Sequence, residues 1–136
     1  MLDATDQQII EELAKNSRIT MKELGEKVHL SAPAAAARIA KLEDNHIIEG
    51  YSIRINQDNL GYPLHTFLTI FTKNTSHQPY LAFIQTKQQF VVNNYKISGQ
   101  GCYLLECRFP SQADLNQFLN ALNDYVNYNL SIVIDK

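Results

Sequence analysis

Residues 20–42 read TMKELGEKVHLSAPAAAARIAKL and contain two helix signals separated by a short turn. Thr20 and Glu23 have the spacing of a capping box, in which a hydroxyl and a carboxylate satisfy free amides at the start of a helix. Ser31 can cap a second helix, and Pro33 then falls in its first turn, where a missing N–H costs little. Two short helices joined by a tight turn are typical of a helix-turn-helix, whose second helix enters the major groove of DNA.

Charge is distributed unevenly along the chain. The formal net charge of −2 on its own argues against a protein that binds nucleic acid. Residues 13–41 nevertheless carry six lysines and arginines against two glutamates, a net charge of +4, and the segments on either side are acidic. Such a basic block lets one face of a small module meet phosphate while the whole chain stays soluble. The same block is also compatible with an ordinary solvated surface.

The residues before and after this stretch extend the first module. Asp3 or Thr5 can cap a first helix, in which Ile9, Ile10 and Leu13 form an apolar stripe. From residue 47 to residue 55 the apolar period changes to two, which predicts the beginning of a strand.

The order and spacing of these residues resemble the signature of the leucine-responsive/asparagine-operon (Lrp/AsnC) regulator family. The matching positions are Leu2-Asp3, Asp6, Leu13, Arg18-Ile19, Glu23-Leu24, Leu30-Ser31, Arg38-Ile39, Leu42-Glu43, Ile47-Ile48, Gly50-Tyr51 and Leu60-Gly61. The resemblance implies a short member of the family, a winged helix-turn-helix transcription factor whose recognition helix runs from Ser31 to Leu42. One departure is His46, which stands where the family usually ends that helix with a glycine. A histidine in the left-handed conformation is tolerated there at some cost.

The second half of the chain alternates apolar strands and helices in the order β-α-β-β-α-β. Its clearest helix signal follows Ser111, where Leu115, Phe118, Leu119 and Leu122 recur at intervals of three and four. The other predicted elements are strands at 65–73, 90–98 and 102–109, a helix that has Pro79 in its first turn, and a last strand that carries Tyr128, Leu130, Ile132 and Ile134.

The expected fold class is therefore α+β, with a winged helix-turn-helix in residues 1–50, a linker strand in 51–61 and a ferredoxin-like βαββαβ sandwich in 62–136. Two helices on one face of such a sheet leave the other face uncovered, and Phe67 and Phe71 belong to that face. We expect self-association through this module. The resemblance implies the same, because the family's second module dimerises by this sheet and its dimers assemble further, to tetramers or octamers.

The predicted DNA contacts lie on and around the second helix of the pair, and they are Ser31, Ala32, Ala34, Arg38, Lys41, Lys22 and Lys27. The run of alanines offers methyl groups, and reading base edges by hydrogen bonds needs polar side chains. We therefore expect double-stranded DNA to be bound with modest sequence specificity, at A/T-rich or curved sites, by dimers that bend or wrap it. A strong helix propensity explains the alanines equally well.

The resemblance also locates a candidate effector site at Gly99, Gly101, Cys102 and Leu130. The family pattern has an aspartate where this chain has Cys102, and losing a carboxylate partner for an amino-acid ammonium weakens binding. The glycines are also compatible with a tight turn between two strands. An amino-acid sensor whose assembly is gated by a small molecule remains an alternative function, as does a winged helix that binds only protein.

No other chemistry is indicated by the sequence. The four histidines have no metal-ligand spacing, and the two cysteines lie at an odd spacing in one predicted strand and are not expected to pair. There is no phosphate-binding glycine loop, serine elbow or paired carboxylates, so we expect neither an enzyme nor a cofactor. No apolar run is long enough for a membrane helix, and the N-terminus lacks the features of a signal peptide. The expected location is the cytoplasm, in association with the nucleoid.

Overall fold

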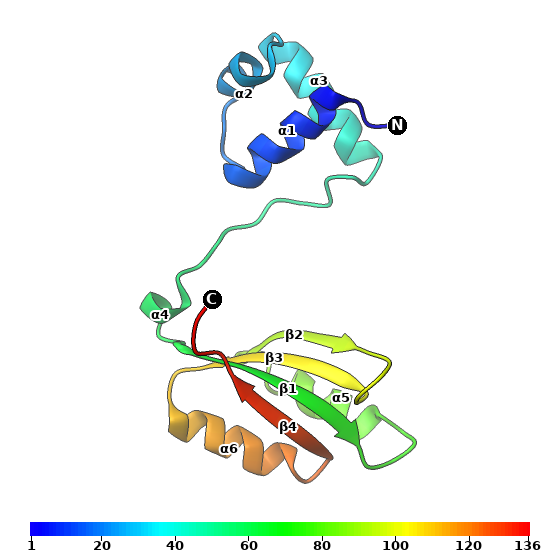
Figure 1. Ribbon diagram of the computed structural model, residues 1–136, viewed down its shortest axis with the longest axis vertical. Coiled ribbons are helices and arrows are strands. Elements are labelled where there is room, and N and C mark those ends of the chain that lie inside the picture. The colour runs from blue at the N-terminus through cyan, green and yellow to red at the C-terminus, as the bar shows by residue number, and fades with distance from the viewer. The chain divides into compact units, whose positions relative to one another are not determined.

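Two units make up the chain, Met1–Arg54 and Ile55–Lys136. The computed structural model describes residues 1–136 (Figure 1). The first unit contains helices only and the second contains one four-stranded sheet with helices, so the expected α+β class is confirmed. None of the helices combines the length and the apolar composition that crossing a bilayer demands.

Three capped helices form the first unit: α1 (Ala4–Lys15), α2 (Met21–Val28) and α3 (Ala32–Asp44). The capping box predicted at Thr20 and Glu23 is present, and Asp3 makes a second one with Asp6, so Asp3 rather than Thr5 caps α1. The Ser31 hydroxyl accepts a hydrogen bond from the Ala34 amide at 3.2 Å, as expected for the cap of α3. The caps explain where each helix begins, because they satisfy amides that have no partner inside the helix.

The turn between α2 and α3 is tight enough to require a glycine before it. A Cβ atom on Gly25 would collide with the Leu30 carbonyl oxygen, so only glycine lets the chain after α2 fold back on that helix. His29 takes the left-handed conformation, with φ of 60°, and the Leu30 amide donates to the Gly25 carbonyl at 2.9 Å. This turn fixes how the two helices of the pair meet. They bury an apolar cluster with α1 around Ile9, Leu24 and Ala35.

The end of α3 confirms the expectation for His46. This residue has φ of 58°, in the left-handed region. The amides of His46 and Ile47 donate to the carbonyls of Glu43 and Leu42 at 3.0 and 2.9 Å. This is the hydrogen-bond pattern of a Schellman motif, which satisfies the last carbonyls of the helix.

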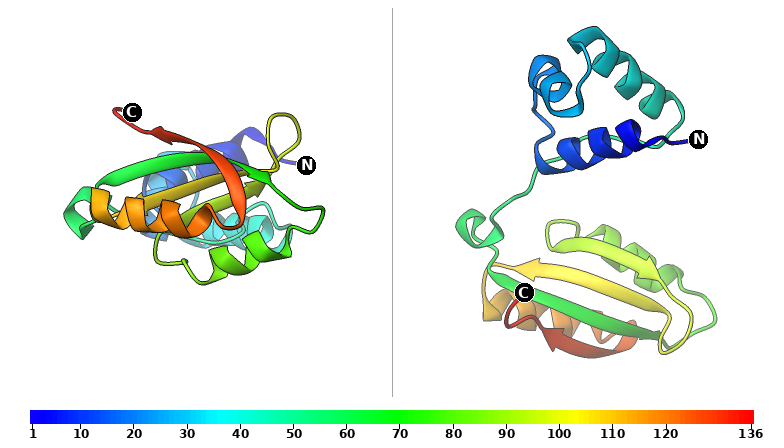
Figure 2. Two further views of the ribbon diagram at one scale, coloured as in Figure 1. Left: turned by 90° about the horizontal axis from the view of Figure 1, so that it is seen from below. Right: turned by 45° about the horizontal axis from the view of Figure 1, so that its top comes forward.

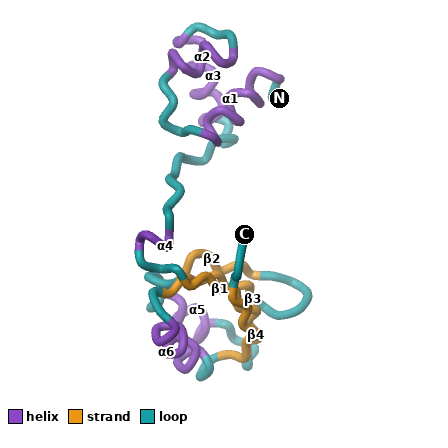
Figure 3. Tube along the Cα trace, turned by 60° about the vertical axis from the view of Figure 1, so that its left-hand side comes forward, coloured by secondary structure: helices purple, strands orange, loops and turns teal.

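The strand predicted from residue 47 to residue 55, and the linker strand predicted for 51–61, were wrong. Residues 47–56 form no regular structure, and residues Gln57–Leu60 form a single helical turn, α4 (Figure 3). A strand needs a neighbour for its backbone hydrogen bonds, and this segment pairs with none of the four strands of the chain. Its apolar side chains are exposed accordingly, with Ile53 at 79%. The first unit therefore has no β wing.

The second unit confirms the predicted order of elements. Its strands are β1 (Leu64–Thr72), β2 (Val91–Lys96), β3 (Tyr103–Phe109) and β4 (Val126–Ile132), and its helices are α5 (Gln78–Gln85) and α6 (Gln112–Leu122). The strands form one antiparallel sheet in the order β2-β3-β1-β4. This order puts the first strand in the middle of the sheet, as in a ferredoxin-like sandwich.

Both long helices of this unit cover the same face of the sheet (Figure 2, left). Alternate residues of β1 and β3 point into this core, among them Leu68, Leu105 and Phe109, which are fully buried. The intervening residues, such as Phe67 and Phe71, are half-buried and belong to the face that no helix covers. Cys107 lies in the core, Cys102 precedes β3, and both cysteines are free, as predicted.

Candidate nucleic-acid interface

Over its first nine residues, 32–40, α3 exposes no side chain that can hydrogen-bond to a base. Ala35, Ile39 and Leu42 face the core of the first unit. Between Ala32 and Ala40 the exposed residues are Pro33, Ala36, Ala37 and Ala40, and the last turn of the helix exposes Lys41, Glu43 and Asp44. Ala32 and Ala34, which the sequence analysis placed on the DNA side, are half-buried. A groove of DNA that met the first nine residues of this helix would therefore meet methyl groups and the proline ring.

The beginning of α3 offers two free hydrogen-bond donors, the Ser31 O–H and the Ala32 amide. Ser31 is exposed, and its oxygen accepts from the Ala34 amide while its O–H stays free to donate. Pro33 has no N–H, and the Ala34 amide donates to Ser31. Among the first three helical residues, only the Ala32 amide therefore has no partner. A phosphate at this end would be held mainly by the partial positive charge of the helix terminus.

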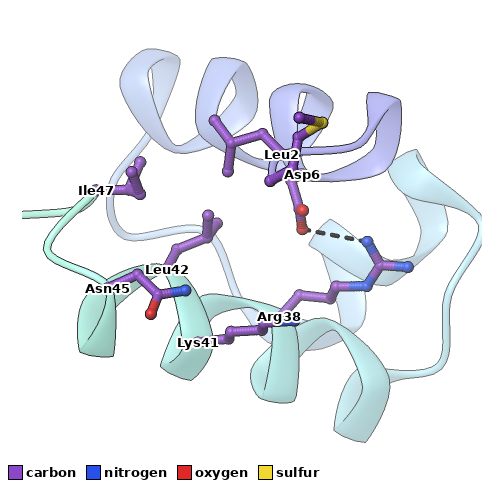
Figure 4. Close-up of a pocket in the computed structure, with 8 residues that line it drawn as sticks. Leu2, Asp6, Arg38, Lys41, Leu42, Asn45 and Ile47 are labelled. Atoms are coloured by element: carbon purple, nitrogen blue, oxygen red, sulfur yellow. Dashed lines mark hydrogen bonds and ion pairs between the residues drawn. The ribbon is translucent and has the colours of Figure 1, made fainter.

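Two carboxylates hold Arg38, the most central basic residue of α3. Its Nη1 atom lies 2.6 Å from Oδ2 of Asp3. The same atom lies 3.1 Å from Oδ1 of Asp6, the contact drawn in Figure 4. The Asp6 amide and the Arg38 guanidinium together hold the pKa of the Asp3 carboxyl below its ordinary value. The same two carboxylates raise the pKa of Arg38.

The predicted lysine contacts differ in how free their side chains are. Lys27 lies 3.6 Å from a carboxylate oxygen of Glu12 and remains 56% exposed. Lys22 and Lys41 are exposed and make no ion pair within 4.0 Å. Of the basic residues predicted to meet DNA, these two are the ones whose charge no carboxylate neutralises.

The candidate effector residues lie on two elements of the second unit, the loop between β2 and β3 and the strand β4. Gly99 and Gly101 lie in the loop between β2 and β3 with φ of 119° and 94°. A Cβ atom on Gly101 would come within 2.6 Å of Cγ2 of Thr69 and within 3.1 Å of the Ile70 carbonyl. This geometry supports the tight-turn interpretation of the glycines, because both the backbone angle and the close approach to β1 require the absence of a side chain.

The other two effector candidates have their own structural partners. The Cys102 amide donates to the Ile70 carbonyl at 2.7 Å, and its thiol lies 3.4 Å from the Thr72 hydroxyl. Leu130 lies opposite Leu68 in the β1–β4 pair and packs against the core of the second unit. Gly99, Gly101 and Cys102 therefore lie together in the loop between β2 and β3, with Cys102 directly before β3. Leu130 lies on β4, at the edge of the sheet.

The partners of Arg38 were missed by sequence reasoning. Asp3 and Asp6 precede it by 35 and 32 residues, and no local periodicity links such distant positions. The available signal was a pair of carboxylates three residues apart at the start of the first helix, which predicts a cap and says nothing of a distant arginine.

A three-helix unit with a helix-turn-helix, followed by an antiparallel sheet covered by two helices, defines the chain as a helix-turn-helix transcriptional regulator. Residues 2–43 match the AsnC-type helix-turn-helix domain. The chain is 60% identical to the HTH-type transcriptional regulator LrpA of Bacillus subtilis over 136 residues, the whole length of both. The structure of B. subtilis LrpC superimposes with a TM-score of 0.92 at 32% identity, covering 100% of this chain and 96% of that one.

A transcriptional regulator of Neisseria meningitidis, solved in complex with L-methionine, superimposes with a TM-score of 0.90 at 25% identity, covering 100% of this chain and 92% of that one. The chain belongs to the Lrp/AsnC family of DNA-binding transcriptional regulators. Membership of this family confirms the predicted resemblance and the prediction that the chain is not an enzyme. It also excludes the alternative of a winged helix that binds only protein.

Proposed function

We propose that this regulator recognises DNA mainly by shape and bendability, with modest sequence specificity, and that it contributes to DNA architecture in the nucleoid. The observation that carries the proposal is the exposed surface of residues 32–40 in α3, where the side chains of Pro33, Ala36, Ala37 and Ala40 present no donor or acceptor. Direct readout depends on such groups, and methyl groups discriminate only by contact with thymine. A protein without them gains specificity from the cost of deforming the DNA, which favours A/T-rich or curved sites.

Phosphate contacts supply the affinity in this proposal. Lys22 and Lys41 are its main contacts, because their charges are unpaired, and Lys27 contributes by exchanging its contact with Glu12 for a phosphate. The DNA backbone would meet the start of α3 at Ser31, Ala32 and Ala34. Arg38 is not among the contacts, because Asp3 and Asp6 already hold its guanidinium.

Binding to two duplexes of equal length, measured by fluorescence anisotropy across a salt series, tests the proposal. One duplex carries phased A-tracts and the other is straight and of mixed sequence. We expect tighter binding to the curved duplex and a steep fall of affinity with salt. An equally sharp footprint on straight DNA would contradict recognition by shape.

A matched pair of variants shows whether α3 is the helix that meets the DNA. A37E adds a carboxylate to the outer side of α3 and is expected to abolish binding to both duplexes. Q117E adds the same charge to the exposed side of α6 and is expected to leave binding unchanged. Equal effects of the two substitutions would show that net charge, and not the outer side of α3, governs binding.

Self-association through the uncovered face of the sheet is the second part of the proposal. This face carries the half-buried rings of Phe67 and Phe71, and His65 there contacts Glu106 at 2.6 Å. A second copy of the chain would remove the two rings from water. Dimers, assembling further to tetramers or octamers, would present several helix-turn-helix units to one DNA molecule, which is what bending or wrapping requires.

A second candidate function is that of a sensor whose assembly is gated by an amino acid. The observation that favours it is the likeness to the N. meningitidis regulator, which was solved with L-methionine. Sedimentation velocity with and without each of the twenty amino acids tests it. A change in oligomer size with one amino acid would support the sensor, whereas an unchanged distribution with all twenty would leave shape-reading as the function.

A further inference from the structure

We propose that Arg38 is a positioning residue, which ties the recognition helix α3 to the start of α1, and that it does not contact DNA phosphate. The proposal rests on the proposed function, because it says which residues of the basic block are free to bind DNA. It changes the expectation from the sequence, which grouped Arg38 with the lysines.

The contacts around Arg38 form a closed set of hydrogen bonds. Oδ1 of Asp3 accepts from the Asp6 amide at 2.8 Å, and Oδ2 of Asp6 accepts from the Asp3 amide at 3.2 Å. Arg38 Nη1 donates to the remaining oxygen of each carboxylate. Each of the four carboxylate oxygens thus accepts one hydrogen bond. Two of these bonds form the capping box of α1, and Arg38 of α3 donates the other two.

The position of Arg38 on its helix agrees with this role. It comes directly before Ile39 and four residues before Leu42, both buried, so it lies beside the buried side of α3. Figure 4 shows its guanidinium directed towards Asp6 at the start of α1. The Arg38 side chain is 34% exposed and that of Asp6 is 15% exposed. The outer alanines of α3 lie on the other side of the helix.

The charge around Arg38 also disfavours a phosphate there. One guanidinium beside two carboxylates makes a local net charge of −1, so an incoming phosphate would meet repulsion from Asp3 and Asp6. To bind Arg38, the phosphate would have to displace two short charge-assisted hydrogen bonds. Lys41, which lies three residues further along α3 and lines the same cavity of about 330 Å³ with Leu42 and Ile47, has no such competitor.

Fixing the cap of α1 to the middle of α3 sets the orientation of the recognition helix. The apolar contacts between these helices determine that they pack, and the directional hydrogen bonds of Arg38 determine their register at the N-terminal end of α1. Removing the hydrogen bonds of Arg38 would not remove any group that binds phosphate. It would misalign the helix that carries Lys41.

The test measures DNA affinity and its salt dependence for the full chain and five variants, the fifth being the triple variant R38Q/D3N/D6N, on the curved duplex. R38Q removes the tie from α3, and D3N/D6N removes it from α1 while asparagine still caps the helix. K41Q removes an expected phosphate contact. E11Q removes a carboxylate of α1 that makes no ion pair and is the control for lost negative charge.

We expect R38Q and D3N/D6N to weaken binding alike, by on the order of fivefold, with the slope of log affinity against log salt unchanged. The triple variant R38Q/D3N/D6N should bind no more weakly than R38Q or D3N/D6N, because these two variants break the same set of hydrogen bonds. K41Q should reduce the slope by about 0.9, the value for one phosphate. E11Q should bind as tightly as the wild type or slightly more tightly. Melting curves followed by circular dichroism confirm that each variant is folded.

Three results would overturn the inference while the proposed function stands. R38Q could flatten the salt slope as K41Q does, which would make Arg38 a phosphate contact. D3N/D6N could bind DNA more tightly than E11Q, which would make the two aspartates competitors of DNA. Unchanged affinity in R38Q together with a lowered melting temperature would make the tie purely structural. A wild type that binds neither duplex would overturn the proposed function, and this inference with it.

Discussion

The two thiols of the chain have opposite environments, and their reactivities should differ accordingly. Burial raises the pKa of the Cys107 thiol to about 12, whereas the hydrogen bond with the Thr72 hydroxyl lowers the pKa of Cys102. Because the thiolate is the reactive form, we expect an aromatic disulfide reagent to label one thiol in the folded protein and two in denaturant. In C102S the folded protein should show none. Rapid labelling of both thiols in the folded wild type would contradict the burial of Cys107.

Side chains whose partners are close in sequence were the ones that could be predicted at this scale. Ser31 caps α3 and His46 ends it in the left-handed conformation, because both roles depend on the backbone of the same helix. Arg38 could not be interpreted in the same way. Its charge pointed to phosphate, and only the packing of α1 on α3 reveals that Asp3 and Asp6 hold it.

Among the elements, the prediction failed where a strand depended on a partner. The alternation from residue 47 to residue 55 is the pattern of a half-buried strand, but residues 47–56 have no neighbouring strand and stay extended without regular structure. The four strands of the second unit were predicted in the right order because each has a partner in the same chain, but the last strand ends at Ile132 and leaves Ile134, which was predicted to belong to it, 97% exposed. Alternation of apolar and polar residues therefore predicts which side chains share a face. Whether a strand forms depends on a neighbouring strand that can accept its backbone hydrogen bonds.

A methyl group added in the loop between β2 and β3 should destabilise the second unit. G101A would put a methyl group 2.6 Å from Cγ2 of Thr69 in a backbone conformation with φ of 94°. We expect it to lower the free energy of unfolding by about 1–3 kcal/mol, measured by urea denaturation. G50A is the matched control, because a Cβ atom there meets nothing within 4 Å, and it should change the unfolding free energy by less than about 0.5 kcal/mol. Equal stability of the two variants would show that the loop can relax around the new methyl group.

At the scale of the whole molecule, the proposed self-association would account for two features. Helices cover one face of the sheet and leave Phe67 and Phe71 on the other. The first nine residues of α3 expose methyl groups and the proline ring, so a single unit has few groups besides its lysines with which to bind DNA. Linking several weak DNA-binding units raises the affinity of the assembly far above that of one unit, provided that all can engage at once.

A charge on the uncovered face of the sheet should therefore separate assembly from folding. We expect F67E to shift the sedimentation profile towards the monomer, because a dimer through this face would have to bury the new carboxylate. The same variant should bind the curved duplex at least tenfold more weakly, since the DNA-binding units then act singly. Q117E, with the same added charge on α6, should keep the wild-type assembly and affinity. An F67E protein that remains fully assembled and melts like the wild type would place the interface elsewhere on the chain.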